Sequence, residues 1–321
     1  MTYFRIGLPA AFGALALALV ATQAQAETRV TYKSAKAGTS YYQMGVEVAE
    51  AVQRASGGAI SVTIEESQGS VQNVMEAAMR PGAFIFTTPP DLIGAAQEGT
   101  GAFKDKANPK FADIRALFPL PALTMHFVAR GDLKAKQLSD LEGHSLLLGK
   151  GSFGATEGEK YLKLFGLEGK IKIADAELSN AVAALKNGQI DAFVTAGSWP
   201  APNVVEAAAS MDVSLISLSD DQIALSKRTR LEIPAGTYKG QTEPLVTTAL
   251  PVVAYSTTQM DDDTAYAVVK SFWEEKARLA EVSPWWNGVT KELIGTIKSK
   301  LHPGALRYYL EAGYPVTDDQ R

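Results

Sequence analysis

The chain has 321 residues, a net charge of −4 and no cysteine. Its length exceeds that of a typical single core and favours two domains, and its 46% of hydrophobic residues is typical of a globular protein. Without cysteine, the chain forms no disulfide and no thiolate metal site. The mildly acidic balance, with no basic block, argues against nucleic acid and anionic lipid as partners.

The N-terminus has the pattern of an export signal. Arg5 precedes an apolar run over 8–20, which is too short to span a bilayer, and a small-x-small motif (AQA) follows at 24–26. We therefore predict cleavage after Ala26, a periplasmic mature chain from Glu27, and no stable membrane insertion. An uncleaved N-terminal anchor is the alternative interpretation.

The first half of the mature chain alternates β-branched runs with helical patterns, as in βα units with a mostly parallel sheet. A Gly57-Gly58 pair ends the first helical pattern, which is a strong C-terminal signal. We predict strands at 28–34, 60–65 and 83–87, and helices at 41–56 and 70–79.

The second half repeats this order of strand, small-residue loop and helix, without a tandem repeat of fixed period. Gly166 and Gly188 end its two helical patterns. We predict strands at 144–148, 170–174 and 190–195, a glycine-rich turn at 149–155, and helices at 156–165 and 179–186.

Two extended, apolar segments with prolines, 119–130 and 244–256, have the character of crossings between lobes. Paired as two strands, they form a hinge on which the lobes close around a ligand. After the signal peptide (1–26), this organisation predicts a discontinuous first lobe, 27–124 plus 252–321, and an inserted second lobe, 125–251.

Small hydroxyl and glycine residues follow five of the predicted strands. In parallel α/β sheets such loops lead into helix N-termini, where free N–H groups and a partial positive charge bind anions. Taken singly, each loop is equally consistent with a plain helix cap. Taken together, they predict a pocket for a small polar anion, with Tyr and Trp side chains as walls. The loops are 38–42, 69–73, 87–88, 151–156 and 195–199.

The segment 149–154 matches G-x-G-x-x-G, and Asp175 lies at the spacing expected for a ribose contact. Alone, this is a dinucleotide fingerprint. The export signal and the lack of an adjacent catalytic set argue against it, and the same loop can bind a carboxylate. We therefore predict no cofactor.

Motifs for enzymatic chemistry are weak. The sequence contains no G-x-S-x-G elbow and no H-E-x-x-H pair, and the spacing of His126, His144 and His302 is not that of metal ligands. We predict no catalytic residue and no metal. An exported enzyme on the same fold is the competing hypothesis, and it needs an acid–base pair in the pocket, for which His126 on the hinge is the only candidate.

Seven segments, in order, carry a resemblance to a known family. They are GTSYY, GSVQNV, DLEGHSLLLGKGSFGAT, LKNGQIDAFVTAGSWP, IPAGTYKG, TTALPVVAYS and HPGALRYYLEAGYP. The mature chain resembles the TAXI-type solute receptors of TRAP transporters. This resemblance implies an α/β fold of the type II periplasmic-binding-protein class, with two lobes joined by a hinge. It also implies a sodium-gradient-driven TRAP permease as partner, and glutamate or a 2-oxoglutarate-like dicarboxylate as ligand.

The resemblance also implies which residues contact the ligand. Thr88 is added to these residues from the third loop, whose sequence departs from the family pattern. The first loop departs from the pattern at Lys36, whose charge can pair with an anion. An ABC-type receptor or a sensor would have a similar site. The predicted ligand-binding residues are Thr39, Tyr41, Tyr42, Ser70, Asn73, Thr88, Ser152, Gly154, Thr156, Thr195, Gly197 and Trp199, with the choice between Tyr41 and Tyr42 left open.

Overall fold

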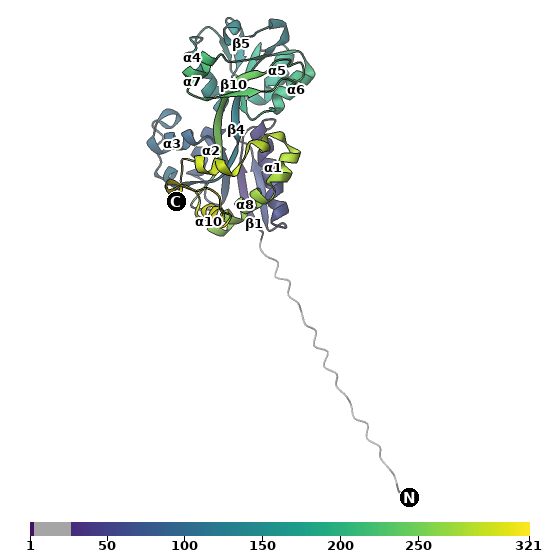
Figure 1. Ribbon diagram of the computed structural model, residues 1–321, viewed down its shortest axis with the longest axis vertical. Helices are drawn as coiled ribbons and strands as arrows, with labels where there is room; N and C mark the ends of the chain where they lie inside the picture. The colour runs from purple at the N-terminus through teal and green to yellow at the C-terminus, as the bar shows by residue number, and fades with distance from the viewer. Residues whose placement is uncertain (3–26) are drawn as a thin grey trace.

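Two lobes, each built of helices packed on strands, are joined by two long strands (Figure 1). This is a computed structural model, and it describes residues 1–2 and 27–321. The predicted signal peptide and its cleavage site lie outside the described residues. The chain leaves the first lobe once, forms the second lobe, and returns, so both the first and the last helices belong to the first lobe (Figure 1).

The first lobe contains three parallel strands in the order β2-β1-β3, and each is followed by a helix. The strands are β1 (Thr28–Lys33), β2 (Ile60–Glu65) and β3 (Phe84–Thr88). The helices that follow them are α1 (Ser40–Ala55), α2 (Ser70–Ala77) and α3 (Pro90–Glu98). The chain ends here with α8 (Asp262–Glu274), α9 (Lys276–Val282) and α10 (Pro303–Glu311).

The second lobe repeats this plan with three parallel strands in the order β7-β5-β6. They are β5 (Ser145–Leu147), β6 (Lys172–Ala174) and β7 (Ala192–Gly197). The helices are α4 (Phe153–Leu164), α5 (Ala181–Lys186), α6 (Pro202–Ser210) and α7 (Asp220–Ser226). Two further strands, β8 (Val213–Ile216) and β9 (Thr229–Ile233), pair with the connecting strands.

The connecting strands, β4 (Ile114–Arg130) and β10 (Leu245–Thr257), contain the two segments predicted as crossings. They pair with each other antiparallel, with Leu123 opposite Leu250. Every pairing of β4 or β10 with another named strand is antiparallel, so the prediction of a mostly parallel sheet holds only for the strands inside each lobe. The reason is that β4 carries the chain into the second lobe and β10 carries it back, so the two strands run in opposite directions. The hinge motion and the lobe boundaries stay predictions.

Helices α1, α4 and α5 start one to three residues from their predicted positions, and α3 and α6 to α10 were not predicted. Helix α4 begins at Phe153, not at residue 156, because Ser152 is the N-cap and its hydroxyl accepts the Ala155 N–H (3.0 Å). Helix α3 was not predicted, although Pro90 occupies its first turn, a position that proline favours. The early start of α4 and the presence of α3 shorten the loops after β5 and β3, so these helix N-termini lie close to the strand ends.

A buried carboxylate ties the C-terminal region to α1. Glu47, on α1, is only 6% exposed. Its oxygens accept N–H groups from Trp285 (3.2 Å) and Trp286 (2.6 Å), and the Ser283 hydroxyl also bonds to it. Trp286 is fully buried, so this pair of tryptophans packs the first lobe, and the carboxylate is satisfied by donors.

Candidate functional site

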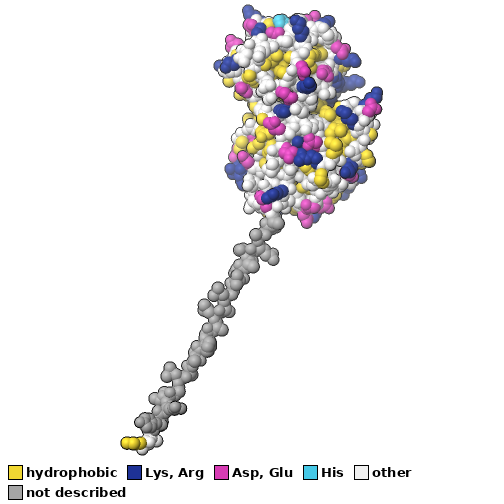
Figure 2. All heavy atoms as spheres, turned by 180° about the vertical axis from the view of Figure 1, so that it is seen from behind, with side chains coloured by type: hydrophobic (Ala, Val, Ile, Leu, Met, Phe, Trp, Pro, Cys, Tyr) yellow, Lys and Arg dark blue, Asp and Glu magenta, His cyan; other side chains and the backbone are white. Residues whose placement is uncertain are grey.

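A cavity lies between the two lobes, where the loops after β1, β2, β5 and β6 meet. Its volume of about 40 Å³ suits a few water-sized groups, so it favours a small ligand over a nucleotide or a sugar polymer. From behind, side chains of both charge signs are scattered over both lobes, and hydrophobic side chains show at the level where the lobes meet (Figure 2). The lining residues are Ser34, Ala35, Lys36, Thr39, Tyr41, Gln68, Gly69, Ser70, Thr87, Leu123, Lys150, Ser152, Phe153, Gly154, Glu177, Leu178 and Ala196.

The first lobe contributes two helix N-termini to this cavity. Helix α1 is capped by Thr39, whose hydroxyl accepts the Tyr42 N–H (3.4 Å) and donates to the Lys36 carbonyl (2.7 Å). Helix α2 is preceded by Gly69, which supplies no side-chain cap. Its first N–H groups therefore have no partner within the helix and lie beside the cavity.

The second lobe contributes the N-terminus of α4, which meets that of α2. A Cβ built on Gly69 would lie 3.5 Å from the Phe153 nitrogen and 3.7 Å from the Ser152 Cα. Gly154 lets the first turn of α4 lie against β7, since a Cβ there would be 3.2 Å from the Ala196 Cβ. The structure thus brings helix N-termini from both lobes to one place, and their partial positive charges add.

The charged groups lining the cavity are Lys36, Lys150 and Glu177. Lys36 Nζ lies 3.7 Å from Glu177 Oε2, which links the two lobes, and Lys150 Nζ lies 3.2 Å from Asp175 Oδ1. With its amide turned to the orientation that satisfies both of its polar atoms, Gln68 joins the first pair, donating to Glu177 (3.1 Å) and accepting from Lys36 (3.3 Å). Each lysine is offset by a carboxylate, so the helix N-termini provide the positive potential that remains.

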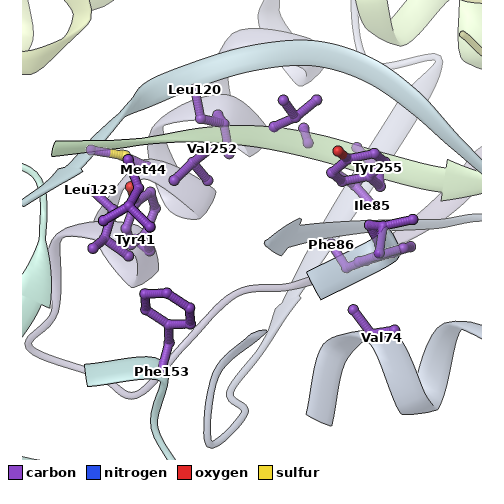
Figure 3. Close-up of a cluster of buried hydrophobic side chains, with 14 of the residues drawn as sticks. Tyr41, Met44, Val74, Ile85, Phe86, Leu120, Leu123, Phe153, Val252 and Tyr255 are labelled. Atoms are coloured by element: carbon purple, nitrogen blue, oxygen red, sulfur yellow. The ribbon is translucent and has the colours of Figure 1, made fainter. Parts of the chain in front are cut away.

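Apolar side chains from both lobes form another wall of the cavity. Phe153 reaches from the start of α4 toward Tyr41 and Leu123 (Figure 3). Tyr41 is 5% exposed, and its hydroxyl donates to the Pro121 carbonyl (2.9 Å). Burial raises the pKa of Tyr41 well above its usual range, so the phenol stays neutral. The wall suits the carbon skeleton of a ligand.

The structure brings five of the predicted ligand-binding residues together at the cavity: Thr39, Tyr41, Ser70, Ser152 and Gly154. The first three come from the first lobe and the other two from the second. All five lie at the start of a helix that follows a parallel strand, which is where the topology rule predicted them. Their contact with a ligand stays a prediction.

Seven predicted residues do not line the cavity: Tyr42, Asn73, Thr88, Thr156, Thr195, Gly197 and Trp199. Most have other surroundings that explain their placement. Asn73 donates to the carbonyls of Ser34 (2.8 Å) and Thr87 (2.9 Å), and so ties α2 to the ends of β1 and β3. The Thr195 hydroxyl bonds to Asn203 (2.9 Å). Thr156 is exposed on α4, Trp199 packs within the second lobe, and Tyr42 faces a neighbouring groove beside Pro202.

Gly197 has a different part in the site. A Cβ there would meet the Ser40 hydroxyl of α1, which accepts the Ser198 N–H (2.8 Å). Ser198 in turn donates its hydroxyl to the Ala122 carbonyl of β4 (2.7 Å). The missing side chain lets the end of β7 and the start of α1 approach one another.

Sequence reasoning missed several lining residues. Glu177 and Leu178 follow β6, a predicted strand whose end was not considered, so the same topology rule would have found them. Ser34 follows β1 directly, and its hydroxyl is buried without a hydrogen-bond partner. Leu123 lies in the middle of β4, where no local pattern marks it.

His126, the histidine considered as an acid or base, does not line the cavity. It is completely buried on β4, and its Nε2 lies 2.8 Å from the Tyr238 hydroxyl, which accepts the Ala201 N–H (2.9 Å). Burial lowers the pKa of His126 to about 4. The imidazole is therefore neutral at neutral pH and belongs to the core of the second lobe.

Residues 1–2 and 27–321 contain neither a candidate metal site nor a membrane-spanning helix. Within these residues, no group of three or more His, Asp or Glu side chains could hold a metal ion. In the same part of the chain, no helix is both long enough and apolar enough to cross a membrane.

Comparison with known proteins places the chain in a family. The model of the NMT1-like family matches residues 33–313, which is most of the chain. The chain belongs to the NMT1-like family. The match includes every element that lines the cavity in both lobes.

Solved structures show the fold of this family member. The periplasmic binding protein BugD is similar at a TM-score of 0.56 and 12% identity, over 91% of this chain and 99% of BugD. MatC from Rhodopseudomonas palustris, solved with bound malate, is similar at a TM-score of 0.51 and 15% identity, over 81% of this chain and 86% of MatC. The prediction of a two-lobe periplasmic-binding-protein fold is confirmed.

Proposed function

We propose that this NMT1-like protein is an extracytoplasmic solute-binding protein, not an enzyme. It captures a small organic anion between its lobes and delivers it to a membrane transporter. The observation that carries the proposal is the meeting of the N-termini of α2 and α4, from different lobes, at one small cavity. An anion placed there is attracted by both lobes at once, so binding favours closure.

For the ligand we propose glutamate or a 2-oxoglutarate-like dicarboxylate. The helix N-termini and the hydroxyls of Thr39, Ser70 and Ser152 suit a carboxylate, and the wall of Tyr41 and Phe153 suits a short carbon chain. The malate bound by the similar MatC is also a small dicarboxylate, so malate belongs among the compounds to test.

For the partner we propose a TRAP permease, on the resemblance of the ordered sequence segments. An ABC-type transporter is the alternative. Uptake of the ligand into membrane vesicles with the candidate permease distinguishes them, because the TRAP system needs a sodium gradient and the ABC system needs ATP.

For the location we propose the periplasm, with the signal peptide removed after Ala26. Similarity in fold to BugD supports an extracytoplasmic protein. N-terminal sequencing of the protein from a periplasmic extract is expected to begin at Glu27, and a chain that begins at Met1 in the membrane fraction would show an uncleaved anchor.

Thermal unfolding of the mature chain tests the ligand proposal. The compounds are L-glutamate, 2-oxoglutarate, malate and an alkanesulfonate. A ligand at 100 times its Kd adds about 2.7 kcal/mol to the free energy of unfolding, which raises Tm measurably. The compound is then recovered and checked for chemical change. Two titratable side chains, Lys36 and Glu177, line the cavity, so turnover of the compound would favour the enzyme hypothesis.

A pair of variants tests whether the rise in Tm comes from binding in the cavity. Ser70 lines it, and its hydroxyl has no hydrogen bond within the described chain, so Ser70→Ala should weaken binding about tenfold with little change in the stability of the free protein. Thr156→Ala, on the exposed side of α4, is the matched control and should bind as the wild type does. Equal affinity for wild type and Ser70→Ala would place the ligand elsewhere.

A further inference from the structure

An arginine outside the cavity joins the two lobes. Arg228, between α7 and β9, lies in the second lobe, and its Nη1 is 2.8 Å from Asp91 Oδ2 in the first turn of α3. Helix α3 belongs to the first lobe (Figure 1). Neither residue lines the cavity.

A buried carboxylate holds Arg228 in place. Glu157, on α4, has a side chain that is 4% exposed, and its two oxygens accept from Arg228 Nε (2.8 Å) and Nη2 (3.2 Å). This two-bond geometry fixes the plane of the guanidinium and leaves Nη1 directed at Asp91. Because α4 also supplies the cavity with Ser152 and Gly154, the same helix connects the ion pair to the site.

We propose that Asp91 and Arg228 are positioning residues: their interlobe ion pair stabilises the closed arrangement of the lobes and so raises affinity without touching the ligand. The ion pair exists only when α3 and α4 are close, so it adds free energy to the closed state alone. Closing the lobes around a ligand then costs less free energy, so the apparent Kd of the ligand is lower. The inference rests on the proposed closure of the lobes but not on the identity of the ligand.

The size of the effect follows from exposure. The Asp91 side chain is 69% exposed, and solvent-exposed ion pairs contribute little. Loss of the pair is therefore expected to lower the ratio of closed to open protein about two- to fivefold, and salt should have a similar effect on the wild type.

Distances between spin labels test this without any ligand. The chain has no cysteine, so labels can be attached to Glu98→Cys on α3 and Lys163→Cys on α4, both of which are exposed positions. In this background, Asp91→Asn removes the charge and leaves the Arg228–Glu157 pair intact. Substitution of Arg228 would instead strand the buried Glu157, so it is avoided.

Asp91→Asn is expected to shift the distance distribution toward longer values in low salt, and Asp91→Glu should restore it. Asp220→Asn is the control, because its partner Arg230 (3.0 Å) lies in the same lobe. High salt should lengthen the wild-type distances and lengthen those of Asp91→Asn less, because, of the described ion pairs, only Lys36–Glu177 is then left between the lobes to screen. A distribution that Asp91→Asn does not alter, or that Asp220→Asn alters equally, overturns the inference. Failure of glutamate to bind would bear only on the proposed function.

Discussion

Lowering the pH from 7 to 5 is expected to destabilise the protein by about 2 kcal/mol through His126 alone. In the folded protein, burial lowers the pKa of His126 to about 4, against 6.5 for a free imidazole. Between these values the unfolded chain binds a proton that the folded protein does not. The contribution of His126 to the free energy of unfolding is therefore fully present above pH 6.5 and is lost as the pH decreases from 6.5 to 4.

The magnitude follows from the shift. Each pH unit below 6.5 costs about 1.4 kcal/mol, so pH 5 lies 1.5 units into a window that is 2.5 units wide. Burial also lowers the pKa of His302, which adds loss of the same sign. The contribution of His126 must therefore be measured as a difference between the wild type and a variant.

The variant is His126→Gln, whose side-chain oxygen can accept the Tyr238 hydroxyl in place of Nε2. Urea unfolding of both proteins at pH 8, 7, 6 and 5 gives the free energy of unfolding. The wild type should lose about 2 kcal/mol more than His126→Gln between pH 7 and 5, and the two should differ by a constant amount between pH 8 and 7. An equal loss below pH 7 would refute the reasoning.

Three further substitutions test other parts of the structure. Lys33→Ala should lower the free energy of unfolding in urea by about 2 kcal/mol, because Glu65 (3.3 Å) and Glu76 (3.2 Å) lose a cationic partner. Lys163→Ala on the surface is the control and should lower it little. Glu47→Ala should cost about 2 to 4 kcal/mol and alter tryptophan fluorescence, because the buried Trp286 N–H loses its acceptor; unchanged emission would contradict this. Gly197→Ala should weaken anion binding in calorimetry, because the new methyl meets the Ser40 hydroxyl between the lobes, and full affinity would count against that close approach.

Much of the fold follows from local patterns in the sequence. The β-branched runs, small-residue loops and helical patterns predicted β1 to β3, β5 to β7, α1, α2, α4 and α5, and a glycine ends most of those helical patterns. Helices α3 and α6 to α10 and strands β8 and β9 were not predicted. The pairing of the two crossing segments was predicted and is confirmed in β4 and β10, but its register was not, because Leu123 and Leu250 are far apart in sequence and meet only when the chain returns to the first lobe.

The site was predictable in position more than in detail. Thr39, Ser70 and Ser152 line the cavity because each begins a helix after a parallel strand, and that position can be recognised locally. Asn73, one turn further along α2, was predicted with them, yet its amide bonds two backbone carbonyls. Sequence does not distinguish these outcomes, because the carbonyls belong to residues that are 39 and 14 positions away along the chain.

The central claim is that an anion binds where the N-termini of α2 and α4 meet. A crystal structure grown with the compound that stabilises the protein most tests it directly. The account predicts carboxylate oxygens within hydrogen-bond distance of backbone N–H groups at Ser70 and at Phe153 or Gly154, with the lobes closed around them. A ligand bound outside this cavity, or one that leaves both helix N-termini to water, would contradict the account.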